Sequence, residues 1–458
     1  MIDRREIDAI AQTLSVRPTE VERDYVNGWL LSGLSRSRLS DSLVLKGGNA
    51  LRKAYFANTR YSKDLDFSSP GAVNRAFLRD EIGAICRFVT EKTGVRFIDE
   101  RLAIEDKRRV SKDLEVLEVR AYFLDFYGEK QRLPLRIYMD VTQYERLWMP
   151  PVQRPLIHSY SDATECTGTV RCMALEEILA SKLKCLLQRR HVADLFDYLR
   201  WVFFEDVSID RAQVLWVFLR KTIYDRAPGA AFELLTNLPF AALQSVWEQY
   251  VNCPSSCRIG FAEGVQRFRQ HLEELFGGQR HSGGYELEFL SSKHREPILS
   301  AGRSMHLMRL VYDGAARIIE PYAIRYKERR DGGGGEYFFA FNVSGGSSPP
   351  GIRAFLPSRM EALQELPQKF APRYEIEVAK AGEIHDDVQF YGRVGRDGFV
   401  PGFGFTRGSA HDGPKHRVRC PQCGKLFARK AHNLRLKPHA HPRGGTCHGS
   451  WASHEGRW

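Results

Sequence analysis

The chain has 458 residues, of which 43% are hydrophobic and 27% charged, a composition typical of a soluble folded protein with roughly two to four domains. No apolar run approaches the roughly 20 residues that a helix needs to cross a bilayer. The N-terminal sequence also lacks the apolar core of a signal peptide. We therefore expect a cytoplasmic protein without a membrane partner.

The formal net charge of +12 is concentrated near the C-terminus. Residues 407–458 contain eleven Lys and Arg against two acidic residues, so this tail carries +9 of the total. Such a tail indicates a partner that is nucleic acid or another polyanion, although a solvated basic tail without a specific partner has the same composition. The nine cysteines of a cytosolic chain argue against a disulfide framework.

Two glycine-rich segments, residues 276–284 and 401–416, predict linkers. They divide the chain into three expected domains, residues 1–275, 285–400 and 415–458. The first should be mixed α/β. Its expected elements are a helix behind a possible capping box of Thr19 and Glu22, a short strand before Gly47, a helix over 49–56, strands over 63–69, 115–126 and 133–142, and mainly helices from 172 to 272.

Asp64 and Asp66 stand two residues apart on a predicted strand, so their side chains should project to the same side. Paired carboxylates suit a hard cation such as Mg²⁺ or Mn²⁺, which phosphoryl-transfer enzymes use together with phosphate oxygens. Asp140 lies on the polar side of another alternating strand and can complete a three-carboxylate site. The alternative is a pair of solvated acids at a strand edge.

Gly47 and Gly48 directly precede a predicted helix, whose N-terminal N–H groups can face phosphate oxygens. A tight strand-to-helix turn is the alternative. Lys182 flanks the leucine stripe of a later helix, where its ammonium either reaches solvent or contacts a triphosphate. Asp194 and Asp197 begin the next helix, where acids also stabilise the helix dipole without a catalytic role.

Together, the segments "LKGGNALRKAYF", "RYSKDLDF", "IYMDVTQ" and "LEEILASKLKCLLQRR" resemble the AbiE-type (AbiEii) toxin nucleotidyltransferases in order and spacing, over about residues 15–270. The resemblance implies an α+β fold with a DNA polymerase β-like nucleotidyltransferase core and a helical extension. It places catalytic metal ions on Asp64, Asp66 and Asp140, and nucleotide contacts on Gly47, Gly48, Asn49, Arg60, Ser62 and Lys182. Asp194 matches a recurring acid that we count among the candidate catalytic residues. The family usually has Thr or Ser where Asn49 stands, and we expect the asparagine amide to donate to phosphate instead.

The reaction that this resemblance implies is attack by an acceptor hydroxyl on the α-phosphate of an NTP, with departure of pyrophosphate. The family's toxins modify RNA, notably tRNA 3′ ends, and are restrained by a cognate antitoxin, in toxin–antitoxin systems or phage defence. The alternative function is a nucleic-acid-binding regulatory protein in which a degenerate transferase fold serves as a scaffold.

Residues 285–400 read as short strands joined by glycine-rich hairpins, which predicts a small SH3/Sm-like β-barrel. The segment resembles a WYL domain through Arg309, Tyr312, Glu320–Tyr322 and the stretch "GIRAFLPSR", with Tyr337–Phe339 in place of the Trp-Tyr-Leu triplet. Arg353 and Arg359 are expected to contact an anionic ligand such as nucleic acid, with ordinary strand-surface charges as the alternative.

The basic tail contains a Cys-x-x-Cys knuckle followed by further Cys and His residues. Cys420, Cys423, His439 and Cys447 satisfy the four-ligand requirement of structural Zn²⁺, with His441 as a substitute for His439. A redox Cys-x-x-Cys is the alternative, but a segment this poor in core residues needs a metal to fold. Phe427 is expected in the core of this zinc finger. The basic residues expected to contact nucleic acid are Lys425, Arg429, Lys430, Arg435 and Lys437.

Overall fold

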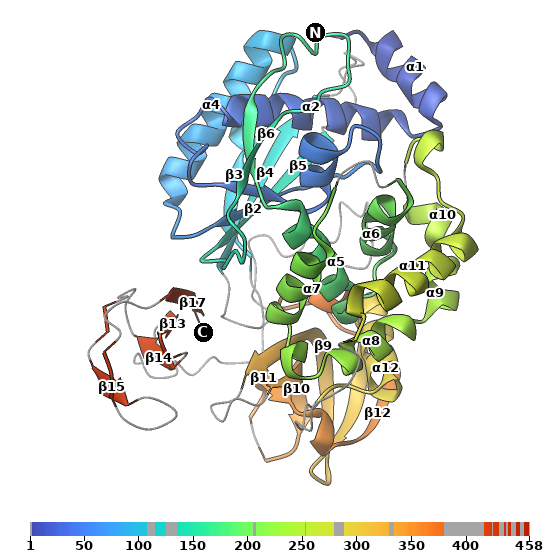
Figure 1. Ribbon diagram of the computed structural model, residues 1–458, viewed down its shortest axis with the longest axis vertical. Coiled ribbons are helices and arrows are strands. Elements are labelled where there is room, and N and C mark those ends of the chain that lie inside the picture. Colours follow the sequence, from blue (N-terminus) through green and yellow to red (C-terminus); the bar gives the residue numbers. More distant parts are fainter. Residues whose placement is uncertain are drawn as a thin grey trace.

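The computed structural model describes residues 2–107, 115–124, 135–204, 208–251, 253–278, 288–328, 334–347, 349–379, 416–423, 425–429, 435–436, 438–440, 446–448 and 453–457 (Figure 1). The buried hydrophobic residues of this part form three separate clusters, which lie within residues 2–276, 290–378 and 418–447. Among the described helices, none combines the length and apolar character that crossing a membrane requires.

The largest sheet is mixed and has seven strands in the order β3-β4-β5-β2-β1-β7-β6. Its strands are β1 (Val44–Lys46), β2 (Leu65–Ser69), β3 (Ala103–Asp106), β4 (Glu115–Phe123), β5 (Leu135–Gln143), β6 (Val152–Pro155) and β7 (Thr169–Cys172). Strand β2 runs parallel to β5 and antiparallel to β1. The period-two pattern predicted from the sequence is present in β5, where Ile137, Met139 and Val141 are buried in the core with Phe67 of β2.

Two helices of the N-terminal half pack against this sheet, α2 (Pro18–Leu34) and α4 (Arg75–Thr93), while α1 (Arg4–Leu14) packs on α2. In Figure 1, α2 and α4 lie against the strands. The capping box expected at Thr19 is wrong, because α2 begins at Pro18 with Arg17 at the N-cap and no side chain caps the helix. Proline at the first helical position has the right φ and needs no N–H partner, so it starts this helix without a box.

The chain leaves β1 through the two glycines into a short helix, α3 (Gly47–Ala50), which continues as a π-helical turn, η1 (Leu51–Tyr55). A buried ion-pair cluster fixes this turn to α2. Asp24 of α2 accepts hydrogen bonds from Arg52 Nε at 2.5 Å and from Lys53 Nζ at 2.8 Å. These buried charged groups therefore hold the segment that follows the two glycines against α2.

Residues 172–276 are mainly helical, as the sequence predicts. The helices are α5 (Leu175–Gln188), α6 (Val192–Phe204), α7 (Arg211–Arg220), α8 (Pro228–Thr236), α9 (Phe240–Gln244), α10 (Trp247–Tyr250) and α11 (Phe261–Phe276). Leu179, Leu183 and Leu186 form the buried stripe expected for α5. This stripe holds α5 in the core and so determines where its polar residues lie.

The middle region begins with a helix, α12 (Ser292–Ser304), and continues as an antiparallel sheet of order β11-β10-β9-β8-β12. The strands are β8 (His306–Tyr312), β9 (Ala315–Glu328), β10 (Gly334–Gly345), β11 (Gly351–Phe355) and β12 (Met360–Lys369). The predicted barrel is not confirmed, because β11 and β12 remain the two edges and no described pairing joins them. Ile298 and Leu299 of α12 pack into the same core as the strands, so a helix helps to cover the apolar face without closure.

The described part of the tail forms two small sheets. One joins β13 (His416–Arg419), β14 (Leu426–Arg429) and β17 (Ser453–Arg457), and the other joins β15 (His439–Ala440) and β16 (Thr446–Cys447). The core of this unit consists of Val418, Leu436 and the cysteines 420 and 447, with Cys423 and Phe427 packed against them. A core this small leaves little hydrophobic stabilisation.

Candidate active site

The sheet places the predicted carboxylates on one face. Asp66 of β2 lies opposite Asp140 of β5 on one side and opposite Lys46 of β1 on the other. Residues that face each other across a ladder project their side chains to the same face of the sheet. Asp64 precedes Asp66 by two residues, and both are partly buried. The structure thus brings together predicted carboxylates from two separate segments, β2 and β5.

Asp140 is buried and already engaged by a lysine. Lys107, which follows β3, approaches Asp140 Oδ2 to 2.7 Å and lies 3.4 Å from both Glu118 of β4 and Glu375 of the middle region. Burial would lower the pKa of Lys107, but the charges of Glu375, Asp140 and Glu118 raise it well above its usual value. The ammonium is therefore charged and compensates three carboxylates.

The two glycines leave space that any other residue would fill. Gly47 has a φ of 73°, and a Cβ atom there would stand 2.8 Å from Asp66 Oδ2. A Cβ atom on Gly48 would stand 2.7 Å from Ser62 Oγ and 2.8 Å from an Arg60 Nη atom. The left-handed backbone at Gly47 favours glycine, and a Cβ atom at either position would displace side chains of Asp66, Ser62 or Arg60.

The side chain of Asn49 does not make the contact that the sequence suggested. Its side chain is fully buried, and its amide nitrogen donates to the backbone carbonyls of Ser62 at 3.2 Å and Asp64 at 2.7 Å. The expectation that this amide donates to phosphate is therefore wrong in this structure. Asn49 instead holds the segment that leads into β2 and so positions Asp64 and Ser62.

Arg60 and Lys182 belong to a buried network of charges beside the glycine turn. Asp197 binds Arg60 through two hydrogen bonds of 2.7 and 2.9 Å and lies 2.6 Å from Lys182 Nζ. Asp194 accepts from Lys182 at 3.1 Å and from Arg189 at 2.7 and 2.8 Å. Both carboxylates lie at the start of α6 and act as acceptors that fix the three cations.

The electrostatics of this network favour an anion. Burial would lower the pKa of Lys182, but Asp197 and Asp194 raise it above its usual value. Burial opposes ionisation of Asp194, yet Arg189 and Lys182 hold the pKa of this carboxyl far below its usual range. The three cations of this network outnumber its two carboxylates by one, and Asp66 is a further negative charge that acts on Arg189.

Arg189 was not among the residues predicted from the sequence. It stands at the C-cap of α5, where a basic residue is commonly explained by the helix dipole. Only its contact with Asp194 across the α5–α6 turn reveals that it belongs to the same network as Lys182. The Asp197 contact with Arg60 was equally invisible, because the two residues are distant in the sequence.

A second charged group borders the carboxylates at the end of β5. Lys46 donates to Thr142 Oγ1 at 3.1 Å and pairs with Glu145, which Ser68 also contacts. Burial would raise the pKa of Glu145, but Lys46 and Lys221 lower it to about 2. Glu145 is therefore ionised and connects the glycine turn to the loop that follows β5.

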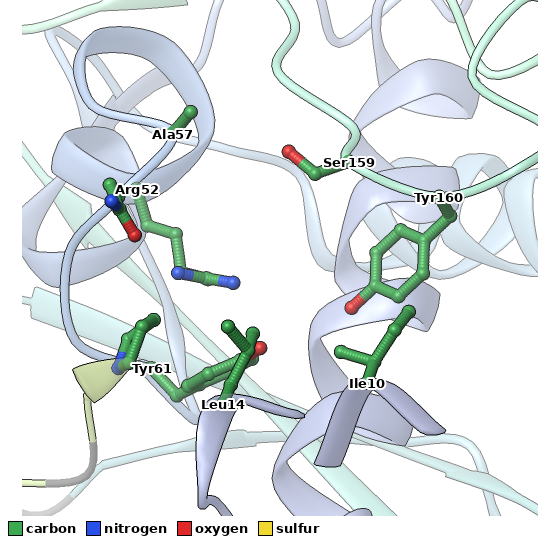
Figure 2. A pocket seen from close by; sticks show the side chains of 9 residues that line it. Ile10, Leu14, Arg52, Ala57, Tyr61, Ser159 and Tyr160 are labelled. Carbon is green, nitrogen blue, oxygen red and sulfur yellow. The ribbon is translucent and has the colours of Figure 1, made fainter. Parts of the chain in front are cut away.

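A separate cavity of about 310 Å³ lies on another side of the 57–61 loop (Figure 2). Residues from α1, from η1 and its following loop, and from the loop after β6 surround it. The lining residues are Ile10, Leu14, Arg52, Ala57, Asn58, Tyr61, Ser159, Tyr160 and Pro254. This lining includes none of the three aspartates, so the cavity is distinct from the candidate active site.

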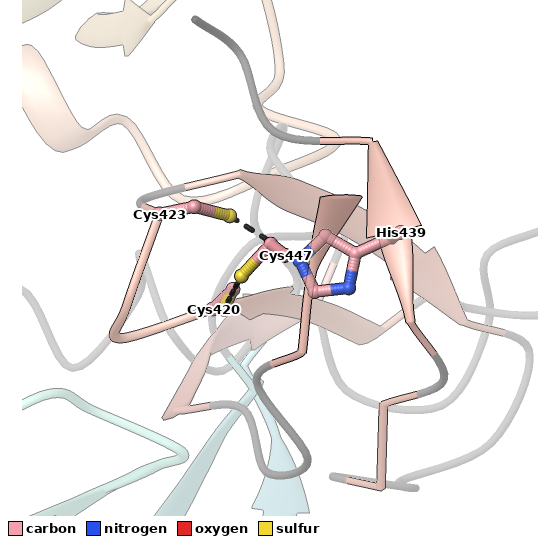
Figure 3. Close-up of side chains that lie close together, drawn as sticks. All are labelled: Cys420, Cys423, His439 and Cys447. Atoms are coloured by element: carbon pink, nitrogen blue, oxygen red, sulfur yellow. Dashed lines mark hydrogen bonds between the residues drawn. The ribbon is translucent and has the colours of Figure 1, made fainter. Parts of the chain in front are cut away.

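In the tail, Cys420, Cys423, His439 and Cys447 converge as predicted, with their potential ligand atoms all within 4.8 Å of one another (Figure 3). Cys420 Sγ lies 3.8 Å from Cys447 Sγ, and Cys423 Sγ lies 3.2 Å from His439 Nε2. A disulfide requires about 2.05 Å between sulfurs, so these cysteines are free. His441 lies outside the described residues.

The residues predicted to contact nucleic acid lie in different surroundings. Arg353 donates to the backbone oxygens of Ile352 and Pro349, and Arg359 pairs with Asp313. Arg435 is exposed and Lys425 partly buried. Of Arg429 only the backbone is described, and Lys430 and Lys437 lie outside the described residues. Phe427 packs edge-on against His439, with the two ring centroids 4.8 Å apart. This contact is consistent with its predicted place in the core.

Residues 29–252 match the protein family described as nucleotidyl transferase AbiEii toxin of type IV toxin–antitoxin systems. The match spans the carboxylates, the glycine turn and the Lys182 network, and it supports a nucleotidyltransferase-toxin region in this part of the chain. It ends before the middle region and the tail, whose WYL-like and zinc-finger natures remain predictions.

Among solved structures, the chain is similar to MenT4, a nucleotidyltransferase toxin from Mycobacterium tuberculosis. The similarity covers 60% of this chain and 90% of MenT4, with 19% identity and a TM-score of 0.39. No curated protein matches the chain.

Proposed function

We propose that the protein is a metal-dependent nucleotidyltransferase that moves the NMP unit of an NTP onto an acceptor hydroxyl. The observation that carries this proposal is the register of β2 and β5, which sets Asp66 beside Asp140. The two residues adjoin the turn at Gly47 and Gly48, where a Cβ atom would crowd the neighbouring side chains. A purely structural turn has no need for two partly buried carboxylates and a cationic network at the same place.

The residues fit a divalent cation such as Mg²⁺ or Mn²⁺. Asp64, Asp66 and Asp140 offer the hard oxygen ligands that such ions prefer, and the absence of a Cβ atom on Gly47 leaves room beside Asp66 Oδ2. Bound there, the ion would supply charge stabilisation for the attacking and leaving oxygens. In this structure Lys107 balances the negative charge of Asp140.

Arg60, Lys182 and Arg189 would bind the triphosphate. Their side chains are fixed by Asp194 and Asp197, so little side-chain entropy is lost when an anion arrives. We assign Asp194 and Asp197 the role of positioning residues, because their carboxylates are bound to cations and almost completely buried. Gly48 and Ser62 border the same space.

For the acceptor we propose RNA, such as a tRNA 3′ end, and for the biological setting a toxin restrained by a cognate antitoxin. The family match and the basic tail support this assignment. The test incubates the purified protein with each α-³²P-labelled NTP, Mg²⁺ and total RNA, beside an Asp66→Ala variant. Transfer that depends on Asp66 supports the proposal, and no transfer under any condition favours a degenerate scaffold with a regulatory role.

For the tail we propose a structural zinc site formed by Cys420, Cys423, His439 and Cys447. A tetrahedral zinc with Zn–S bonds of about 2.3 Å sets two sulfurs about 3.8 Å apart, which agrees with the 3.8 Å between Cys420 and Cys447. The small core of this unit also gives the metal an evident folding role. The basic side chains around it would contact nucleic acid.

A further inference from the structure

Two tryptophans next to the candidate active site form a contact on the surface. Trp148, in the loop after β5, and Trp216 of α7 meet edge-to-face with their ring centroids 5.9 Å apart. Trp216 is 45% exposed, the highest value for a large hydrophobic side chain in the described part of the chain. An exposed indole presents a flat aromatic face on which another ring can stack.

Each indole carries an arginine. The guanidinium of Arg146 lies 3.6 Å from the ring centroid of Trp148, and that of Arg220 lies 5.7 Å from the centroid of Trp216. In such cation–π contacts the positive guanidinium lies over the electron-rich face of the indole. The four side chains, Arg146, Trp148, Trp216 and Arg220, are called the Trp–Arg platform below.

The platform is held rigidly from below. Glu177 of α5 is completely buried and accepts hydrogen bonds from the backbone N–H groups of Trp148 and Met149 at 2.9 to 3.1 Å. Lys221, which follows α7, lies 2.7 Å from the same carboxylate. One buried acid therefore ties both parts of the platform to α5, the helix that also carries Lys182.

The platform's surroundings favour a polyanion with flat rings over a protein. The exposed positions of α7 beside Trp216 are polar or small, namely Arg211, Ala212, Gln213 and Arg220. The other exposed large hydrophobic residues in the described part, Leu124, Phe204 and Phe289, belong to other elements. Trp and Arg also anchor protein interfaces, but no other exposed large hydrophobic side chain of the described part lies on α7, whereas aromatic faces framed by arginines suit stacked bases and phosphates.

The platform adjoins the catalytic residues through a short path. Arg146 directly follows Glu145, which pairs with Lys46 and Ser68. Lys46 lies opposite Asp66, and Ser68 follows Asp66 by two residues on β2. The platform is thus linked to the carboxylates of the candidate active site through Glu145, Lys46 and Ser68.

From these observations we infer that the Trp–Arg platform binds the single-stranded end of the acceptor RNA, with bases stacked on the indoles and guanidinium planes. The inference rests on the proposed function only for the role of the bound strand as acceptor. Binding of the strand is a separate property, which can be measured without turnover.

The experiment measures binding of a fluorescein-labelled single-stranded RNA of about 10 nucleotides by anisotropy, in the full chain carrying Asp66→Ala so that no chemistry occurs. Trp216→Ala is expected to weaken binding about tenfold, and Trp216→Phe much less, because a phenyl ring still stacks. Arg220→Gln is expected to weaken binding and to reduce its salt dependence. The matched control is Phe204→Ala, which removes another exposed aromatic that lies under an arginine, Arg200.

In the active protein, Trp216→Ala should raise the KM for RNA and leave the KM for NTP unchanged. Equal RNA binding by Trp216→Ala and its parent would overturn the inference, as would equal losses in Trp216→Ala and Phe204→Ala. If RNA binds through Trp216 but no nucleotide is transferred, the platform stands and the proposed function fails. If Trp216→Ala abolishes binding of a co-purifying protein but not of RNA, the surface is a protein interface and the inference is wrong.

Discussion

Asp66 and Asp140 lie directly opposite each other on the parallel strands β2 and β5. Backbone pairing, and not side-chain packing alone, therefore fixes how far apart their carboxylates stand. A site built on strands is more precise than one built on loops. Glu118 continues the same row on β4, and Lys107 compensates the acids of this row.

Gly47→Ala tests whether the turn must stay open. The new Cβ atom would stand 2.8 Å from Asp66 Oδ2 at a φ of 73°, so Asp66 must shift. We expect kcat to fall about 100-fold, the effect of a misplacement of about 1 Å. Gly71→Ala is the control, because a Cβ atom there meets nothing within 4 Å. Steady-state kinetics that show equal activity in both variants would contradict the assigned role.

Asp197→Asn tests the positioning of the cations. The variant removes the carboxylate that binds Arg60 and leaves the buried Lys182 paired with Asp194. Loss of one partner of a buried pair costs about 3 kcal/mol, and we expect the KM for NTP to rise as Arg60 loses its anchor. Urea unfolding and NTP titration measure the two effects. The control Asp313→Asn breaks an exposed pair with Arg359 and should cost less than about 1 kcal/mol. A stable Asp197→Asn variant with normal KM would refute the network.

The decrease in the free energy of unfolding at acid pH should depend on Glu145. Its pKa is lowered from 4.5 to about 2 in the folded protein, since Lys46 and Lys221 outweigh the effect of burial. A depressed carboxyl pKa stabilises the fold above pH 4.5, and this contribution disappears as the pH falls from 4.5 to about 2. Glu145→Gln should therefore cost up to about 3 kcal/mol at pH 7 and almost nothing near pH 2.

Denaturant unfolding as a function of pH measures this difference. The control is Glu91→Gln, which changes an exposed glutamate of α4. Parallel stability curves for Glu145→Gln and the parent protein across the whole acid range would show that Glu145 is not paired as described.

Zinc should be present at one ion per chain and should stabilise the tail. Cys447→Ser removes one of the four converging side chains, and we expect it to lose the metal and the protease resistance of residues 416–457. The control Cys185→Ser changes a partly buried cysteine of α5 and should keep both. Metal analysis by mass spectrometry and limited proteolysis with and without a chelator provide the readout. Full zinc content in Cys447→Ser would exclude this ligand set.

The elements that carry the carboxylates were predictable because local patterns define them. Alternation in 135–143 and the placement of Asp66 on β2, with Asp64 just before it, follow from the period of a strand. The register of β2 against β5 and the contacts of Arg60 and Arg189 were not predictable, since they join segments that are distant in sequence. Asn49 was misassigned because its neighbours in sequence do not reveal the carbonyls of Ser62 and Asp64 that it binds.

The small β-barrel expected in the middle region is not confirmed, for a related reason. Helix α12 contains Pro297, which disfavours a helix in any reading of the sequence, so the helix that packs on the sheet went unnoticed. The sequence pattern predicted strands in this region. It could not show which element covers their apolar face, because that depends on packing between different segments of the chain. The convergence of Cys420, Cys423, His439 and Cys447, in contrast, was predictable because metal ligation restricts residue type and spacing.

The most direct test of the central claim is which phosphate of the NTP is transferred, and whether Asp66 is needed. With RNA as acceptor, label from α-³²P-NTP should become acid-precipitable and label from γ-³²P-NTP should not, while Asp66→Asn abolishes transfer and the control Asp80→Asn, at an exposed position of α4, retains it. Transfer of the γ-label, or undiminished α-label transfer by Asp66→Asn, would contradict the account.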